Sequence, residues 1–264
     1  MTNLYGLPEE LKVEADGPVR IVTLNRPEDR NPATTAMLFA LTTLAQELAR
    51  DEAARAVVLT GAGKAFSAGG DFQHLVRTTR EPEVAKATLD NSRRFISAMI
   101  DLPIPVIAAV NGPAVGFGAT LAALCDIVLM AEEAVFIEPH VNIGLILGDG
   151  LSVTWPFYMS LLKAKEFVFT GDRISAAEAV RVGMANRAVP GETLMSEAVA
   201  LAHRIAVQPR SALRGSKQML NLYMKAVLDS VLEPVLALQL EQMAGPDHGR
   251  IVQGMIDRQK RSQA

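Results

Sequence analysis

The chain has 264 residues, of which 49% are hydrophobic and 21% are charged, a balance typical of a globular protein with a buried core. Its formal net charge is −3 and it has no basic tract, which argues against nucleic acid as a partner. Its one cysteine, Cys125, excludes an intrachain disulfide and a thiolate metal cluster, and we expect it to be a small core residue. No apolar run reaches the roughly 18 residues that cross a membrane, and the first residues do not resemble a signal peptide. We therefore expect a cytoplasmic protein with no membrane partner and no metal.

Strands and helices alternate over the first half of the chain. Short β-branched apolar runs predict strands at 11–15, 19–24, 56–60, 106–110, 126–130 and 134–137. Apolar residues at helical spacing predict helices at 34–50, 82–101 and 117–124. Beyond these the pattern is mainly helical, at 151–170, 175–182, 192–207, 209–243 and 247–261. Taken alone, the alternation favours an α/β domain with a doubly wound sheet.

Two glycine-rich loops each follow a predicted buried strand. The first lies in VVLTGAGKAFSAGGDF at 57–72, and the second is NGPAVGFG at 111–118. Missing side chains let backbone N–H groups approach a ligand closely. Such a loop can aim amide donors at an oxygen that becomes negatively charged during a reaction.

Five segments, taken in order and spacing, resemble the crotonase superfamily, also called the enoyl-CoA hydratase/isomerases. They are IVTLNRP at 21–27, the two glycine-loop segments at 57–72 and 105–118, CDIVLMAEEAVF at 125–136 and FTGDRISAAEA at 169–179. The resemblance implies an α/β fold of a different kind from a doubly wound sheet. It implies a crotonase-like ββα spiral core at 1–200 and a C-terminal helical trimerisation region at 201–264, in a homotrimer or dimer of trimers. It also implies an acyl-CoA thioester substrate, with coenzyme A as part of that substrate and no separate cofactor.

The resemblance assigns an oxyanion hole for the thioester oxygen to two backbone N–H groups, those of Ala68 and Phe117. Phe117 stands where most relatives carry glycine, so its ring would narrow or reshape the acyl pocket while the backbone donor survives. The wider set implied to bind substrate and coenzyme A comprises Ala65, Phe66, Ala68, Gly69, Gly70, Asp71 and Phe117.

The two glutamates that relatives use for acid–base chemistry are both missing. Their positions fall on Thr120 and His140. A threonine hydroxyl is a poor base, although it can orient a water molecule, and Thr120 fits equally well as a buried helix residue beside the pocket. Histidine titrates near neutral pH and suits proton transfer, so we expect His140 to be catalytic, the alternative being a hydrogen-bonded structural histidine.

Asp149 and Glu138 lie close to His140 in the sequence. Asp149 sits in GDG before a predicted helix, where it could cap that helix or serve as a catalytic carboxylate beside His140. Glu138 could be a third member of the site, but a solvated glutamate at a strand end is the preferred interpretation. The remaining histidines, His74, His203 and His248, are expected to be solvated.

Three functions stay open. The leading hypothesis is an acyl-CoA enzyme, a hydratase/isomerase-type lyase that stabilises a thioester enolate and uses His140 and Asp149 in place of the glutamates. The pattern PH…GDG…WP at 139–156 is also similar to the β-diketone hydrolase branch, which breaks a carbon–carbon bond with a His–Asp pair and without coenzyme A. The intact KAFSAGGDF favours the thioester instead. The third hypothesis is a catalytically silent acyl-CoA binder, because both glutamates are lost.

Overall fold

The structure is a computed structural model that describes residues 3–263. A six-stranded sheet has the strand order β1-β2-β3-β4-β6-β9. The first two strands are antiparallel, and every later strand runs parallel to its neighbour. Their bounds are Leu11–Asp16 (β1), Val19–Leu24 (β2), Ala56–Gly61 (β3), Val106–Val110 (β4), Ile127–Ala131 (β6) and Arg187–Val189 (β9).

A second sheet of three short strands takes the segments that lie between the strands of the first. Its order is β5-β7-β8, with bounds Ala114–Val115 (β5), Val135–Ile137 (β7) and Arg173–Ser175 (β8). Successive segments thus alternate between the two sheets: β4 precedes β5, and β6 precedes β7. A doubly wound sheet would reverse its strand order at a switch point, whereas these strands are added in chain order. The expectation of a doubly wound sheet is therefore wrong, and the chain forms a spiral.

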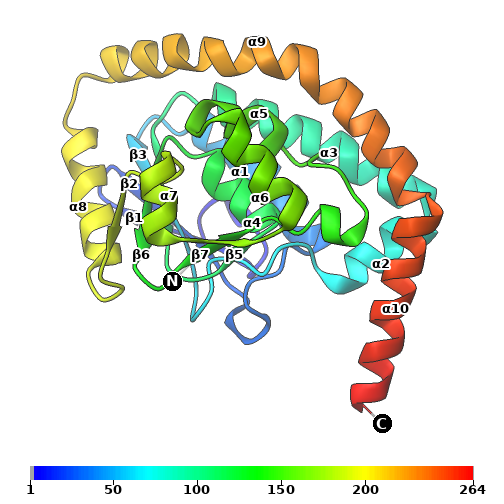
Figure 1. Ribbon diagram of the computed structural model, residues 1–264. Helices are drawn as coiled ribbons and strands as arrows, with labels where there is room; N and C mark the ends of the chain where they lie inside the picture. The colour runs from blue at the N-terminus through cyan, green and yellow to red at the C-terminus, as the bar shows by residue number, and fades with distance from the viewer. Residues whose placement is uncertain (1–2, 264) are drawn as a thin grey trace.

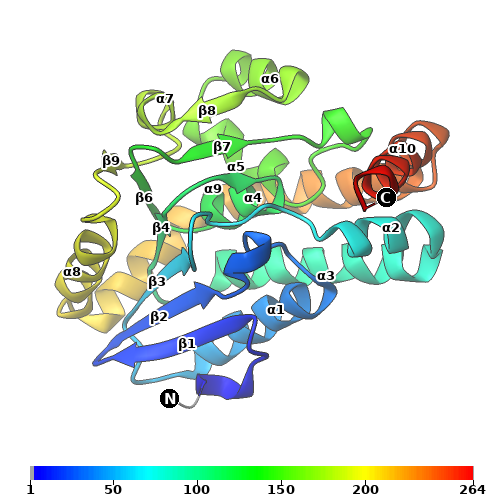
Figure 2. The ribbon, with the colours of Figure 1, turned by 90° about the horizontal axis from the view of Figure 1, so that it is seen from below.

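Helices pack around the sheets, and the last two form an arm over one side of the molecule (Figures 1 and 2). Short 3₁₀ helices occupy Leu4–Gly6, Pro27–Asp29 and Val141–Ile143 (η3). The α-helices are Thr35–Arg50 (α1), Phe72–Arg80 (α2), Pro82–Asp101 (α3), Phe117–Ala123 (α4), Leu151–Tyr158 (α5), Leu161–Thr170 (α6), Ala176–Val182 (α7), Leu194–Ala206 (α8), Arg210–Met243 (α9) and Pro246–Gln263 (α10).

The helices differ from the sequence-based expectations in two places: one predicted helix is split, and one helix was not predicted. The predicted helix at 151–170 is two helices, because Ser160 caps a new one by accepting a hydrogen bond from the N–H of Lys163. The helix α2 was not expected at all. Asp71 starts it, since its carboxylate accepts a hydrogen bond of 3.0 Å from the N–H of His74.

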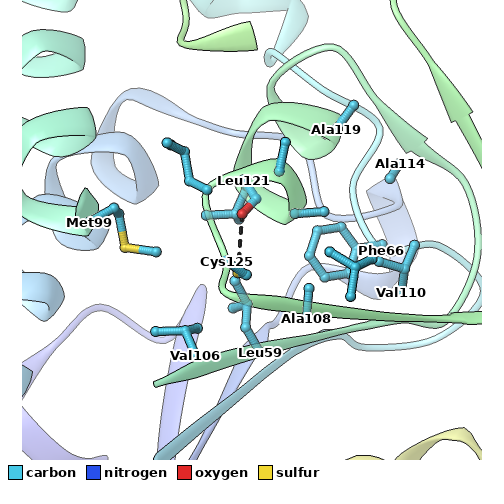
Figure 3. Packing of buried hydrophobic residues seen from close by; sticks show 14 of the residues in the cluster. Leu59, Phe66, Met99, Val106, Ala108, Val110, Ala114, Ala119, Leu121 and Cys125 are labelled. Atoms are coloured by element: carbon cyan, nitrogen blue, oxygen red, sulfur yellow. Dashed lines mark hydrogen bonds between the residues drawn. The ribbon is translucent and has the colours of Figure 1, made fainter. Parts of the chain in front are cut away.

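The core lies between the large sheet and the helices packed on it, and Figure 3 shows its tightly packed part around Phe66 and Leu121. Cys125 is buried there, and its thiol donates a hydrogen bond of 3.3 Å to the carbonyl of Leu121. Burial raises the pKa of this thiol far above its usual range. Cys125 is thus a core residue, as the sequence predicts, and it is a poor nucleophile.

The C-terminal helices pack on the core rather than forming a separate unit. The long helix α9 contacts α3 and α5, and α10 lies beside α2 (Figures 1 and 2). At its N-terminal end α9 is tied down by Lys217, whose Nζ is 2.6 Å from Asp126 Oδ2 and donates to the carbonyl of Ile104. The division at residue 200 and the trimer contacts stay predictions. In the described part of the chain, no helix has the length and apolarity needed to span a membrane.

Candidate active site

A pocket of about 240 Å³ opens where the two glycine loops meet α2, α3 and the end of α9. Much of its wall is apolar, and it includes Leu38, Leu75, Leu89, Phe117 and Met243. Two of the residues placed there by sequence reasoning, His140 and Asp149, also line it. A concave apolar pocket with a few convergent polar groups is the usual form of a small-molecule site.

Backbone contacts join the two glycine loops. The N–H of Val115 donates to the carbonyl of Ser67 at 2.9 Å. Gly69 has a φ of +90°, and a Cβ there would lie 2.8 Å from the carbonyl oxygen of Val115. Glycine is therefore needed at this position both for its backbone conformation and for the close approach of the loops.

The two proposed oxyanion donors differ in their surroundings. Phe117 is the first residue of α4, and its N-cap, Gly116, offers no side chain to the N–H groups of the first turn. Helix N-termini leave such donors without an intrahelical partner. The N–H of Ala68, in contrast, donates to the carbonyl of Arg30 at 2.8 Å. A thioester oxygen would have to share or replace that hydrogen bond.

The seven residues implied to bind substrate fall into two groups. Ala65 and Phe66 are buried in the protein, and their side chains do not line the pocket. The pocket wall includes Ala68, Gly69, Gly70, Asp71 and Phe117. The ring centroid of Phe117 lies 5.8 Å from that of Phe95, and the role of Phe117 in shaping an acyl pocket stays a prediction.

Three ionisable side chains, those of Glu138, His140 and Asp149, lie together on the segment 138–150, which we call the His–Asp loop, and the last two line the pocket. The Nδ1 of His140 forms a short hydrogen bond with Glu138, whose carboxylate also accepts the backbone N–H of His140 at 2.9 Å. On the other side of the ring, Nε2 is 3.7 Å from Oδ2 of Asp149. The loop thus holds one imidazole between two carboxylates.

Glu138 and Asp149 depart from their simplest interpretations. Glu138 is only 1% exposed, so the expectation of a solvated strand-end glutamate is wrong. Asp149 does not cap α5, because Gly150 occupies the N-cap position and no side chain caps that helix. Both carboxylate oxygens of Asp149 are buried without a hydrogen-bond partner in the described residues. Buried polar groups without a partner are rare in folded proteins.

The environment shifts the protonation of the pair. Burial by itself lowers the pKa of His140, but the charges of Asp149 and Glu138 outweigh it and raise the pKa to about 9. Burial is also the largest influence on Asp149 and raises the pKa of its carboxyl, against the favourable charge of His140. Because the two groups interact strongly, their titration belongs to the pair rather than to either residue. Both shifts favour the protonated form of the group concerned.

Thr120 stands next to this cluster on α4. It is fully buried and its hydroxyl has no hydrogen-bond partner among the described residues. A methyl-bearing side chain of this size fills the space beside Gly150, where a Cβ would lie 3.3 Å from Cγ2 of Thr120. The position therefore offers a hydroxyl but no acid or base.

The other histidines are only partly as expected. His203 is on the surface, with Nε2 2.8 Å from Asp16. His74 is buried, lines the pocket and contacts the hydroxyls of Thr35 and Thr88. Burial lowers the pKa of His74. His248 is fully buried, so the expectation that it and His74 are solvated is wrong.

Sequence reasoning also missed the wall contributed by the C-terminal helices. Gln239 and Met243, both near the end of α9, line the pocket. Periodicity shows that both are on a helix but not which part of the core that helix covers. On α2, the spacing of His74, Leu75 and Thr78 would have placed them on one helix face if the helix had been expected.

A family model described as enoyl-CoA hydratase/isomerase matches residues 14–256. A short-chain-enoyl-CoA hydratase of Clostridium acetobutylicum is 34% identical over 221 residues, which are 83% of this chain and 84% of that protein. The crystal structure of an enoyl-CoA hydratase/isomerase from Mycobacterium paratuberculosis superposes with a TM-score of 0.92 at 42% identity, and the match covers 95% of this chain and all of the other. The crystal structure of an enoyl-CoA hydratase from Mycobacterium avium subsp. paratuberculosis K-10 gives 0.85 at 26% identity, covering 94% and 96%.

The fold and site thus define a crotonase-fold protein, which confirms the spiral implied by the resemblance. The chain belongs to the enoyl-CoA hydratase/isomerase family and is an enzyme of the hydratase/isomerase type. Among the residues described, no group of three or more histidine, cysteine, aspartate or glutamate side chains is arranged to hold a metal ion.

Proposed function

We propose that the protein acts on an acyl-CoA thioester, stabilising its enolate with backbone N–H groups and moving protons with His140 and Asp149. The observation that carries the proposal is the Glu138–His140–Asp149 cluster, whose His140 and Asp149 line the same pocket as Ala68 and Phe117. Strongly perturbed ionisable groups in a cleft are typical of catalytic sites. The family supplies the substrate class, and its relatives are named for enoyl-CoA hydration.

The oxygen of the thioester would be held by the N–H groups of Phe117 and Ala68. The free first turn of α4 favours negative charge near Phe117. The second donor becomes available when the oxygen takes the place of the Arg30 carbonyl at Ala68. Removal of one donor of this kind typically costs about 100-fold to 1,000-fold in kcat.

The two ionisable groups then divide the proton transfers. In a hydration, Asp149 accepts a proton from water as the water oxygen bonds to the β-carbon, and protonated His140 delivers a proton to the α-carbon. The proton on Asp149 can return to His140 across their 3.7 Å separation, which restores the starting state. In an isomerisation, Asp149 removes a proton from the acyl chain and His140 returns one at another carbon. Glu138 keeps the imidazole oriented and charged through Nδ1.

The test combines binding with turnover. Crotonyl-CoA and a saturated acyl-CoA are titrated by calorimetry, and hydration, isomerisation and exchange of the α-proton in D₂O are measured by NMR. We expect binding, and we expect His140→Gln and Asp149→Asn to lower turnover about 100-fold or more, the usual size of an acid–base contribution. The matched control is His203→Gln, the same change on the surface. If no acyl-CoA binds, the proposal is wrong. Binding without turnover would identify a silent binder, and turnover that is unchanged in both variants would show that His140 and Asp149 do not move the protons.

The close approach of His140 to Asp149 also supports a second candidate, hydrolysis of cyclic β-diketones. In that reaction the pair would direct a water molecule at a ketone carbonyl and break the adjacent carbon–carbon bond. A panel of cyclic diketones tests this function directly. Turnover of a diketone that His140→Gln abolishes, without acyl-CoA binding, would favour it over the thioester reaction.

A further inference from the structure

His248 on α10 contacts both the His–Asp loop and helix α2. Its Nδ1 is 2.6 Å from the carbonyl oxygen of Ile143 in η3. Because a carbonyl can only accept, Nδ1 must carry the hydrogen. The other ring nitrogen, Nε2, is 3.2 Å from the hydroxyl of Thr79 on α2. The ring is fully buried, so these contacts are shielded from competing water.

The last two turns of α9 hold the same loop at two further points. The Oε1 of Gln242 accepts a hydrogen bond of 2.7 Å from the N–H of Ile146. Gln239 packs directly on Gly148, where a Cβ would lie 1.8 Å from Oε1. The C-terminal helices thus contact the loop at Ile143, Ile146 and Gly148, between the two proposed catalytic side chains.

Among the described residues, the backbone hydrogen bonds within the loop are short-range, and none joins the turn that carries His140 to the segment that carries Asp149. These residues lie nine positions apart, and only the short η3 helix intervenes. Several local backbone hydrogen bonds close the first turn, among them those from the N–H of Leu145 to the carbonyl of His140 and from the N–H of Ile143 to the carbonyl of Pro139. The second half of the loop, at 146–149, has one backbone hydrogen bond of its own, from the N–H of Gly148 to the carbonyl of Ile146, and is contacted by Gln239 and Gln242 of α9. Displacement of a reacting group by about 1 Å can cost about 100-fold in rate.

We propose that His248 is a positioning residue that, together with Gln242, sets the geometry of the His140–Asp149 pair from the C-terminal helices. The expected effect on kcat rests on the proposed function. The expected change in the mobility of the His–Asp loop does not depend on that function. The C-terminal region then has a second role in completing the active site, beyond the expected role in assembly.

The test compares variants that keep or lose one hydrogen bond. His248→Leu loses both ring contacts, His248→Asn keeps a donor near the place of Nδ1, and Thr79→Val removes only the partner of Nε2. A second pair, Gln242→Met and Gln242→Glu, loses or keeps the acceptor for Ile146. The control is His203→Leu on the surface. The readouts are kcat and KM with crotonyl-CoA, and deuterium uptake of peptides covering 138–150.

We expect His248→Leu to lower kcat at least tenfold with KM changed less than threefold, and to raise deuterium uptake in the loop. His248→Asn should recover kcat to within about threefold of the unmodified protein. The kcat of Gln242→Glu should likewise be higher than that of Gln242→Met. If His248 served packing alone, His248→Leu would lower the melting temperature. His248→Asn would then not restore kcat, and kcat would not fall more than KM changes.

Unchanged loop exchange and kcat in His248→Leu would overturn the proposal, as would an Asn variant no better than the Leu variant. If His248→Leu does not fold, the Gln242 pair decides by the same criteria. Failure of the proposed function is distinct, because it would show as unchanged turnover in His140→Gln. The loop exchange in His248→Leu would still report whether the C-terminal helices hold the loop.

Discussion

The two halves of the site obtain their chemistry in different ways. Around Ala68 and Phe117 the groups proposed to meet a substrate are backbone N–H groups, and the loops that carry them are joined to each other by backbone contacts, such as that from the N–H of Val115 to the carbonyl of Ser67. On the His–Asp loop the groups are side chains, and they are held by residues about a hundred positions further along the chain. A backbone donor survives almost any substitution, whereas an acid or base depends on the residue type. The family's glycine loops can therefore persist here while the glutamates have been replaced.

The largest expected effect tests whether His140 and Asp149 act as one unit. Each single substitution, His140→Gln and Asp149→Asn, should lower kcat about 100-fold to 10,000-fold. The double variant should then be no more than about tenfold worse than the poorer single variant, because groups that act together are strongly non-additive. Steady-state kinetics on the four proteins give the coupling. Fully multiplicative losses would show that the two residues act independently.

The second prediction concerns pH. In the proposed mechanism protonated His140 is the proton donor. Its pKa is raised to about 9, so kcat should fall about tenfold for each pH unit above about 9. A raised pKa also means that the stability contributed by the protonated ring is fully present below the pKa of the unfolded chain and is lost as the pH rises through about 9. His140→Gln should lose both dependences. Rate profiles and urea unfolding between pH 6 and 10 measure them, and a profile that is flat beyond pH 9 would contradict the assignment.

The third prediction tests the joining of the glycine loops. Gly69→Ala should destabilise the protein by about 1–3 kcal/mol, because φ is +90° and the new Cβ would meet the Val115 carbonyl. The adjacent Gly70 has open space where its Cβ would lie, so Gly70→Ala should change the free energy of unfolding by less than about 0.5 kcal/mol. Chemical denaturation compares them. Equal destabilisation by the two variants would show that the loops are not held together at Gly69.

The smallest effect on kcat is expected at Phe117. If only its backbone N–H acts on the substrate, a change of its side chain should be tolerated. Phe117→Ala removes the ring contact with Phe95, worth about 0.5–1.5 kcal/mol, but leaves the backbone N–H in place. We expect kcat with crotonyl-CoA within about fivefold of the unmodified protein, and a lower KM for acyl chains with bulky substituents. A loss of about 100-fold or more would show that the side chain takes part in the chemistry itself.

The sequence predicts the parts of this structure that depend on local pattern. The strands at 19–24 and 106–110 and the helix at 82–101 are where periodicity places them. The spiral could not be predicted from the alternation of elements, because a strand such as β5 has only two residues and joins a different sheet from β4. The resemblance to the family supplied that arrangement.

The side-chain half of the site was harder to predict. His140 and Asp149 could be singled out because they fall in or near family positions. Glu138 could not be recognised as buried, because nothing in a three-residue strand reveals that its end is covered. His248 and Gln242 lie on an amphipathic helical pattern that is compatible with many packing partners. Their contacts with the loop are tertiary and leave no periodic signal.

The anchoring of the His–Asp loop by His248 has a consequence during synthesis. Ile143 and His248 are separated by 105 positions, which a ribosome adding about 5–20 residues per second takes roughly 5–20 s to cover. Every strand of both sheets precedes α9 in the chain. The sheets can therefore assemble while the loop still lacks its anchors, and the proposed acid–base pair would reach its final position only after the C-terminal helices have been made.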